Sequence, residues 1–264
     1  MKKIVVFIIC LISLVALASL SYAGDSSLDR VKKEGKLVIG LDDSFPPMGY
    51  RIADGTLVGF DVDAAEELGR RLGIEIVWKP TAWSGVVHSL NSKMFDCIWN
   101  GMTITPERQE KVAFTRPYIM DGQIAVVRFN EKRFRTPADL GGSVVGAQKD
   151  SSAIKAIEKM PNPPKAVKEY ADNPKALLDL EAGRTDAVVI DNVAGRHAIS
   201  KRIGRFKALP GNISKEPFGI AFRKADADLL AEVQKTIDEM IADGTMAKIS
   251  KKWFAEDITD PEKW

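Results

Sequence analysis

Strand-like and helix-like segments alternate along this chain of 264 residues, and the alternation restricts the fold more than any other feature. The apolar stretch 36–42 predicts a buried strand, and residues 60–72 carry apolar side chains at helical spacing. A strand at 74–78, a short helix at 83–91 and a strand at 94–99 follow. This βαβαβ order is typical of a mostly parallel sheet with helices on its faces.

A second alternating run occupies the middle of the chain. Strands at 144–147, 166–170 and 186–191 are separated by helical segments at 151–160 and 173–181. Two such runs predict an α/β protein with two lobes. Ligands of open α/β sheets bind beyond the carboxyl ends of the strands, so we expect the site in the cleft between the lobes. The remaining predicted elements are strands at 122–128 and 218–223, and helices at 192–203, 226–242 and 245–254.

The first 23 residues have the pattern of a secretory signal peptide. Lys2 and Lys3 precede the apolar run 4–20, and small residues lead to a cleavage site after Ala23. A membrane anchor is the alternative, although the run is short for a membrane span. The sequence therefore predicts an exported protein of the bacterial periplasm.

Composition narrows the partners of the mature chain. Lys2 and Lys3 account for the formal net charge of +2, so cleavage leaves a chain that is neutral overall. Such a chain lacks the basic excess of a nucleic-acid-binding protein, and we expect no nucleic-acid partner. Only Cys97 remains after cleavage, which excludes an internal disulfide. In a strand pattern, it is most simply a small buried side chain.

The segment from Trp99 to Arg108 predicts an anion site. We expect the strand to end at Asn100-Gly101, so that backbone N–H groups, the Thr103 hydroxyl and the Arg108 guanidinium meet there. Arg binds a planar carboxylate through two parallel hydrogen bonds. The alternative is a polar loop with a surface arginine.

Five motifs in order carry a resemblance over essentially the whole mature chain. The chain resembles the periplasmic polar amino-acid-binding proteins of ABC importers, which are bacterial solute-binding proteins of family 3. The resemblance implies the two-lobed periplasmic-binding-protein type II fold, with its ligand in the interlobe cleft. The motifs are Leu-Asp-Asp-Ser-Phe-Pro-Pro at 41–47, Val-Gly-Phe-Asp-Val-Asp at 58–63, Gly-Met-Thr-Ile-Thr-Pro-Glu-Arg at 101–108, Asp-Ala-Val-Val-Ile-Asp at 186–191 and Lys-Trp-Phe at 252–254.

The same resemblance implies the lobe boundaries. The first lobe would hold residues 24–118 and 219–264, and the second would hold 123–215. The two hinge strands would lie near 118–122 and 214–218.

Residue by residue, the resemblance also implies how an α-amino acid is held. Arg108 would bind the ligand carboxylate, with help from Thr103 and the Gly101 backbone. Asp191 would receive the α-ammonium group, although a helix N-cap is the alternative for this residue. Ser152 would close over the carboxylate. Ser151 is equally well explained as an N-cap.

Other matched positions concern the ligand side chain. Phe45 and Trp83 would form aromatic walls, which suit an aliphatic stem or a guanidinium plane, while two ordinary core aromatics remain the alternative. Asp42 would meet the far end of the ligand. Asn100 stands where many relatives carry Ala or Ser, and it would narrow the wall of the site. Gln148 would be a position that selects the ligand side chain. Lys149-Asp150 replaces a turn that often carries Gly at its second position, a conformation that Asp tolerates less well.

The favoured hypothesis is a binding protein without catalysis that captures a basic L-amino acid, with glutamine as the closest competitor. We expect a monomer that delivers its ligand to a membrane ABC permease and needs no cofactor or metal. One alternative is a dehydratase-like enzyme on the same scaffold that acts on a carboxylated small molecule. Another is a ligand sensor module, which we would expect to continue into a membrane segment.

Overall fold

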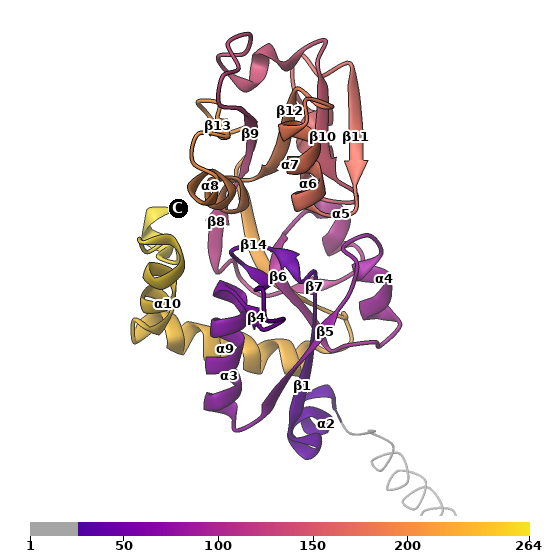
Figure 1. Cartoon of the computed structure of the whole chain (residues 1–264). Coiled ribbons are helices and arrows are strands. Elements are labelled where there is room, and N and C mark those ends of the chain that lie inside the picture. The colour runs from indigo at the N-terminus through magenta and orange to yellow at the C-terminus, as the bar shows by residue number, and fades with distance from the viewer. Residues whose placement is uncertain (1–25) are drawn as a thin grey trace, which may run out of the picture.

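The computed structural model describes residues 26–264 and contains two α/β units stacked end to end (Figure 1). We call the unit built on a six-stranded sheet lobe 1 and the unit built on a five-stranded sheet lobe 2. The arrangement confirms the predicted two-lobed α/β fold. The expected signal peptide at 1–23 lies outside the described residues.

Lobe 1 contains the N-terminal and C-terminal parts of the described chain. Its sheet has the order β5-β1-β6-β14-β7, and β8 also pairs with β14. The sheet strands are β1 (Lys36–Leu41), β5 (Glu75–Pro80), β6 (Cys97–Thr103), β7 (Ala113–Phe114), β8 (Ile119–Asp121) and β14 (Glu216–Phe222). The helices are α2 (Ser27–Glu34), α3 (Phe60–Leu72), α4 (Val86–Asn91), α5 (Pro106–Gln109), α9 (Ala227–Ala242) and α10 (Thr245–Phe254), with a 3₁₀ turn η2 (Pro261–Lys263). A small sheet adds β2 (Ser44–Phe45), β3 (Gly49–Arg51) and β4 (Leu57–Val58).

Lobe 2 repeats the pattern of parallel strands and helices. Its sheet has the order β11-β10-β12-β9-β13, in which β10 pairs parallel with β11 and β12. The strands are β9 (Gln123–Arg128), β10 (Val144–Gln148), β11 (Ala166–Tyr170), β12 (Ala187–Asp191) and β13 (Phe206–Ala208). The helices are α6 (Ser152–Glu158), α7 (Asn173–Glu181) and α8 (Asn192–Lys201), with a 3₁₀ turn η1 (Pro137–Leu140).

The central strands of both sheets are buried because helices cover their faces. All five residues of β12 are buried, and so are all seven of β6. Such strands form continuous apolar runs rather than an alternating pattern, as is usual for parallel sheets. Cys97 is fully buried in β6, as its strand pattern predicted. No helix among the described residues is long and apolar enough to cross a membrane.

The structure corrects the end of one predicted strand. β6 does not stop at Asn100-Gly101 but continues to Thr103, because Met102 and Thr103 pair with Gly219 and Phe218 of β14. Gly101 lies within the strand at a positive φ of 55°, which a residue with a side chain adopts only with strain.

A predicted helix also begins later than expected. α4 starts at Val86 rather than at residue 83, because Gly85 takes a left-handed conformation directly before it. Trp83 therefore lies in the preceding loop.

The chain passes between the lobes twice, from β8 into β9 and from β13 into β14 (Figure 1). The two passages touch: Ile213 N–H donates to the Gln123 carbonyl at 2.7 Å. A Cβ atom on Gly122 would lie only 2.1 Å from the Ser214 carbonyl oxygen. We propose these passages as the hinge strands expected near 118–122 and 214–218, with the lobe boundaries expected around them.

Gly122→Ala is therefore expected to push the two passages apart. We predict a loss of about 3 kcal/mol in the free energy of unfolding, since a backbone carbonyl cannot move as a side chain can. Urea denaturation checks this value. The control is Gly73→Ala, where a Cβ atom meets nothing within 4 Å and the cost is the left-handed backbone alone, about 1 kcal/mol. Equal losses in the two variants would contradict this account.

Candidate functional site

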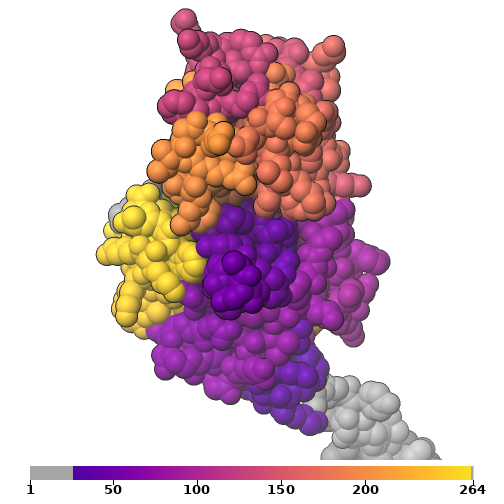
Figure 2. Space-filling view, viewed as in Figure 1, coloured from indigo at the N-terminus to yellow at the C-terminus, as the bar shows by residue number. Residues whose placement is uncertain are grey.

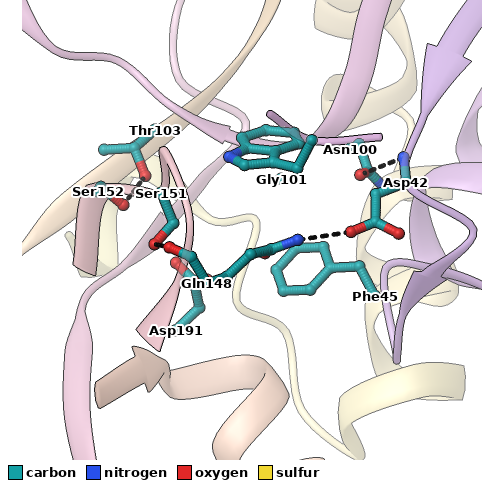
Figure 3. Close-up of a pocket in the computed structure, with 10 residues that line it drawn as sticks. Asp42, Phe45, Asn100, Gly101, Thr103, Gln148, Ser151, Ser152 and Asp191 are labelled. Atoms are coloured by element: carbon teal, nitrogen blue, oxygen red, sulfur yellow. Dashed lines mark hydrogen bonds between the residues drawn. The ribbon is translucent and has the colours of Figure 1, made fainter. Parts of the chain in front are cut away.

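One cavity between the lobes collects ten of the eleven predicted site residues (Figure 3). The empty space between its walls, open solvent included, is about 280 Å³. The parallel strands β1 and β6 of lobe 1, and β10 and β12 of lobe 2, point their carboxyl ends at it, as expected for open α/β sheets. The lining residues are Asp42, Phe45, Trp83, Asn100, Gly101 and Thr103 from lobe 1, and Gln148, Ser151, Ser152 and Asp191 from lobe 2.

The lobes are in contact around this cavity. Figure 2 shows lobe 2 seated directly on the indigo N-terminal part and beside the yellow C-terminal helices of lobe 1. Across the cavity, Gln148 Nε2 donates to Asp42 Oδ2 at 2.7 Å, and the Thr103 and Ser152 hydroxyls lie 3.0 Å apart. The structure is therefore a closed form of the cleft.

Asp42 lies at one end of the cavity, directly after β1. Its Oδ1 atom accepts hydrogen bonds from the Ser44 N–H and hydroxyl groups, and its own N–H donates to Asn100 Oδ1 at 3.0 Å. These bonds fix the carboxylate, so that Oδ2 faces lobe 2 and meets Gln148 (Figure 3).

Gln148 at the end of β10 is oriented by its own neighbours. Its Nε2 atom also donates to the Ala171 carbonyl at 3.2 Å, and its Oε1 atom accepts from Asn173 Nδ2 at 3.3 Å. Since a carboxylate can only accept, the amide NH₂ group must face Asp42. A neutral donor of lobe 2 thus pairs with the Asp42 carboxylate of lobe 1.

Asp191 lies at the opposite end of the cavity (Figure 3). It stands at the N-cap position of α8, but its side chain makes no capping bond. Instead, Asp191 Oδ1 accepts from Gln123 Nε2 at 2.7 Å. Ser151 likewise occupies an N-cap position without a capping bond, and its hydroxyl donates to the Gln148 carbonyl.

Arg108 is the one predicted residue outside the cavity lining. It lines the adjoining open groove, and its guanidinium lies 5.4 Å from the centre of the Trp83 ring. Two of its N–H groups donate to the Thr103 carbonyl at 2.9 Å and, across the cleft, to the Asp150 carbonyl at 3.3 Å. A guanidinium carries five N–H donors, so these bonds leave others for an anion.

Asp150 adds a second contact at the mouth of the cleft. It adopts a φ of 59°, the left-handed conformation that the turn requires at this position. Its Oδ2 atom accepts from the Ser84 hydroxyl of lobe 1 at 2.5 Å. An aspartate in place of glycine therefore provides a bond between the lobes.

Sequence reasoning missed three polar residues behind the cavity: Asp121, Gln123 and Glu216. Gln123 Nε2 lies within 3.2 Å of both Ser152 Oγ and Glu216 Oε2. The only sequence signal was the occurrence of polar residues at strand ends in the two expected hinge segments. Gln123 and Glu216 come together only through contacts between segments about 90 residues apart in the sequence.

Buried carboxyl groups dominate the electrostatics at the Asp191 end of the cavity. Burial raises the pKa of Asp191 well above its usual range, and the nearby Asp121 and Glu216 carboxylates raise it further. Burial also raises the pKa of Asp121 to about 7. Burial lowers the pKa of the Arg108 guanidinium, while the negative charges of Asp191 and Glu216 raise it. Among the described residues, no group of His, Cys, Asp and Glu side chains is arranged to hold a metal ion.

A buried network supports the lobe 1 wall of the cavity. The Gly101 N–H group donates to the Tyr118 hydroxyl at 3.1 Å, and that hydroxyl donates to Asp61 Oδ1 at 2.9 Å. A Cβ atom on Gly101 would lie 2.9 Å from the Phe45 ring, so the glycine lets this ring reach the cavity. Asp61 is fully buried, and burial raises its pKa to about 7.

Two sheets joined by two passages, with facing strand ends around one polar cavity, define a two-lobed ligand-binding protein. The chain belongs to the bacterial extracellular solute-binding proteins, family 3, whose model matches residues 37–256.

Individual relatives agree with this family. The chain is 36% identical over 240 residues to the L-cystine-binding protein TcyJ of Escherichia coli K12. These aligned residues cover 90% of each sequence. It is similar to a variant of ArgBP from T. maritima, with a TM-score of 0.80, 37% identity, and coverage of 86% of this chain and 99% of that one. An arginine-bound form of ArgBP also matches. The ancestral amino-acid-binding protein AncCDT-1, described as a precursor of cyclohexadienyl dehydratase, has a TM-score of 0.79 and 32% identity, with coverage of 87% of this chain and 99% of that one.

The raised pKa of Asp61 predicts a pH-dependent effect of Asp61→Asn. Between pH 4 and 7 the unfolded chain ionises Asp61 while the folded protein keeps its proton, so wild type loses stability as the pH rises. The variant cannot titrate there. Relative to wild type, it should therefore gain about 2 kcal/mol between pH 5 and pH 7. Urea denaturation of both proteins at the two pH values measures this gain. A difference that stays constant with pH would contradict the assignment.

Proposed function

We propose that this protein binds a free L-amino acid with a cationic side chain, arginine or lysine, in the interlobe cavity. It would then deliver the ligand, in the periplasm, to an ABC permease. The relatives support amino-acid binding in general, since they include proteins named for cystine and arginine.

The observation that carries the choice of ligand is the distribution of charge. Asp42 and Asp191 lie at opposite ends of one cavity, and none of the described residues that line it is cationic. The nearby Arg108 acts electrostatically on Asp191 and Glu216 at the second end. Arg108 and Asp191 at one end complement the α-carboxylate and α-ammonium groups of an amino acid. Asp42 at the other end complements a second cation on its side chain.

Six of the predicted residues then have a role in binding. Arg108 binds the ligand carboxylate with its remaining N–H donors, and Asp191 accepts from the α-ammonium group. The side-chain cation displaces the Gln148 amide from Asp42, because a charged donor makes a stronger bond with a carboxylate than a neutral one does. Phe45 and Trp83 provide the apolar walls for the stem.

Cystine is the second ligand candidate, because TcyJ is identical to this chain at 36% of the aligned positions. Its distal ammonium group would meet Asp42 in the same way. Glutamine, which also carries a donor at its far end, is a third.

An enzyme is the alternative class. The comparison with AncCDT-1 and the raised pKa of the Asp191 carboxyl favour it, since a general acid must hold its proton near neutral pH. We propose binding without catalysis. Incubating the protein with its ligand and recovering that ligand unchanged, as judged by NMR, supports binding, whereas a dehydrated product would establish the enzyme.

Isothermal titration calorimetry with L-arginine and L-glutamine tests the proposal. Asp42→Asn should weaken L-arginine binding by about 10–100-fold, because it removes a charged acceptor, and should change L-glutamine binding much less. Arg108→Ala should abolish binding of both, because the α-carboxylate loses its main partner.

The matched control is Lys111→Ala. Lys111 is an exposed cation in the same groove as Arg108, and its removal should leave the affinity unchanged. Equal losses for the two ligands in Asp42→Asn would exclude Asp42 as a reader of charge. A wild-type protein that binds neither arginine nor lysine would contradict the proposed ligand class.

A further inference from the structure

Glu216 and Gln123 open the two strands that follow the passages between the lobes. Glu216 is the first residue of β14, and Gln123 is the first residue of β9. Gln123 is fully buried and Glu216 is 8% exposed. Neither lines the cavity, yet both contact residues that do.

Glu216 uses both of its oxygen atoms. Oε1 accepts from the Ser214 hydroxyl at 2.7 Å, whereas Oε2 accepts from the Thr103 hydroxyl at 3.0 Å and from Gln123 Nε2 at 3.2 Å. Gln123 Nε2 faces two further acceptors, Asp191 Oδ1 at 2.7 Å and Ser152 Oγ at 3.2 Å. One glutamine thus links Glu216 to Asp191 and Ser152.

These contacts determine the direction of each hydroxyl bond. A carboxylate only accepts, so Thr103 must give its single proton to Glu216. The Thr103 oxygen then has only lone pairs to offer elsewhere, and Ser152, 3.0 Å away, donates to it. The chain of bonds runs from Ser152 through Thr103 to Glu216.

The Gln123 amide agrees with this direction. Its NH₂ group faces three oxygen acceptors, and its Oε1 atom is buried without a hydrogen-bond partner among the described residues. A reversed amide would place oxygen against the Asp191 and Glu216 oxygens, which would be repulsive. The donors of this network therefore all point toward the two carboxylates.

We propose that Glu216, held in place by Gln123 and Ser214, is a positioning residue that turns Thr103 into an acceptor for the α-ammonium group of the ligand. Thr103 and Asp191 line the same cavity, so the remaining lone pair of Thr103 offers the ligand a second acceptor. The site then selects amino acids over the corresponding acids that lack the ammonium group. This inference rests on the proposed function, and it gives the Thr103 hydroxyl a different role from the expected help in binding the carboxylate.

The test compares two probes by isothermal titration calorimetry. They are L-arginine and 5-guanidinopentanoic acid, which is the same molecule without its α-ammonium group. The ratio of their dissociation constants measures the selection for the ammonium group. Glu216→Met removes the acceptor for Thr103 and should lower this ratio about tenfold or more. The affinity for 5-guanidinopentanoic acid should change little, because this probe makes no ammonium contact.

Glu216→Gln is the matched variant. Its amide oxygen can still accept from Thr103, so the ratio should stay close to that of wild type. An unchanged ratio in Glu216→Met, or equal weakening of both probes, would overturn the proposal. If Glu216→Met does not fold, Thr103→Val removes the same acceptor and must lower the ratio in the same way, and an unchanged ratio would be equally decisive.

Failure of the proposed function gives a different result. Wild type would then bind no L-arginine, and L-glutamine with its des-amino analogue glutaramic acid would replace the first pair of probes. With either pair of probes, the ratio of dissociation constants in the Glu216 variants decides the role of this residue.

Discussion

Negative charge buried between the lobes is the constraint on which this structure depends. Asp191, Glu216 and Asp121 lie close together where the two passages are in contact, and Asp42 lies at the other end of the cavity. Buried carboxylates are costly unless they are hydrogen-bonded, paired or protonated. Here, hydroxyl and amide donors satisfy part of this need, and Arg108 supplies one positive charge nearby. The remaining excess of carboxylates is what a cationic ligand would neutralise.

Hydrogen bonds between the two lobes explain why the cleft can close. Gln148 meets Asp42, Ser152 meets Thr103, and Asp150 meets Ser84, and each pair joins one lobe to the other. Neutral donors make all three contacts. A ligand with charged donors would replace the first of them by a stronger bond, so that the free energy of binding and the free energy of closure become linked.

The fold and most of the site could be predicted because they depend on local patterns. Alternating apolar segments specify the two sheets, and motifs at strand ends brought ten residues to one cavity. The extent of β6 could not be predicted, because pairing with β14, more than 110 residues away, carries it to Thr103. Gln123 and Glu216 were missed for the same reason, since neither has a partner near it in sequence that marks it as functional.

Proton release on binding tests the central claim most directly. Burial raises the pKa of the Asp191 and Asp121 carboxyls, so they bind protons at a higher pH than ordinary aspartates do. An α-ammonium group beside Asp191 would favour ionisation and expel protons. Calorimetric titration with L-arginine near pH 6, in buffers of different ionisation enthalpy, measures the number released. We predict a net release of protons, and a binding enthalpy that is independent of the buffer would contradict the account.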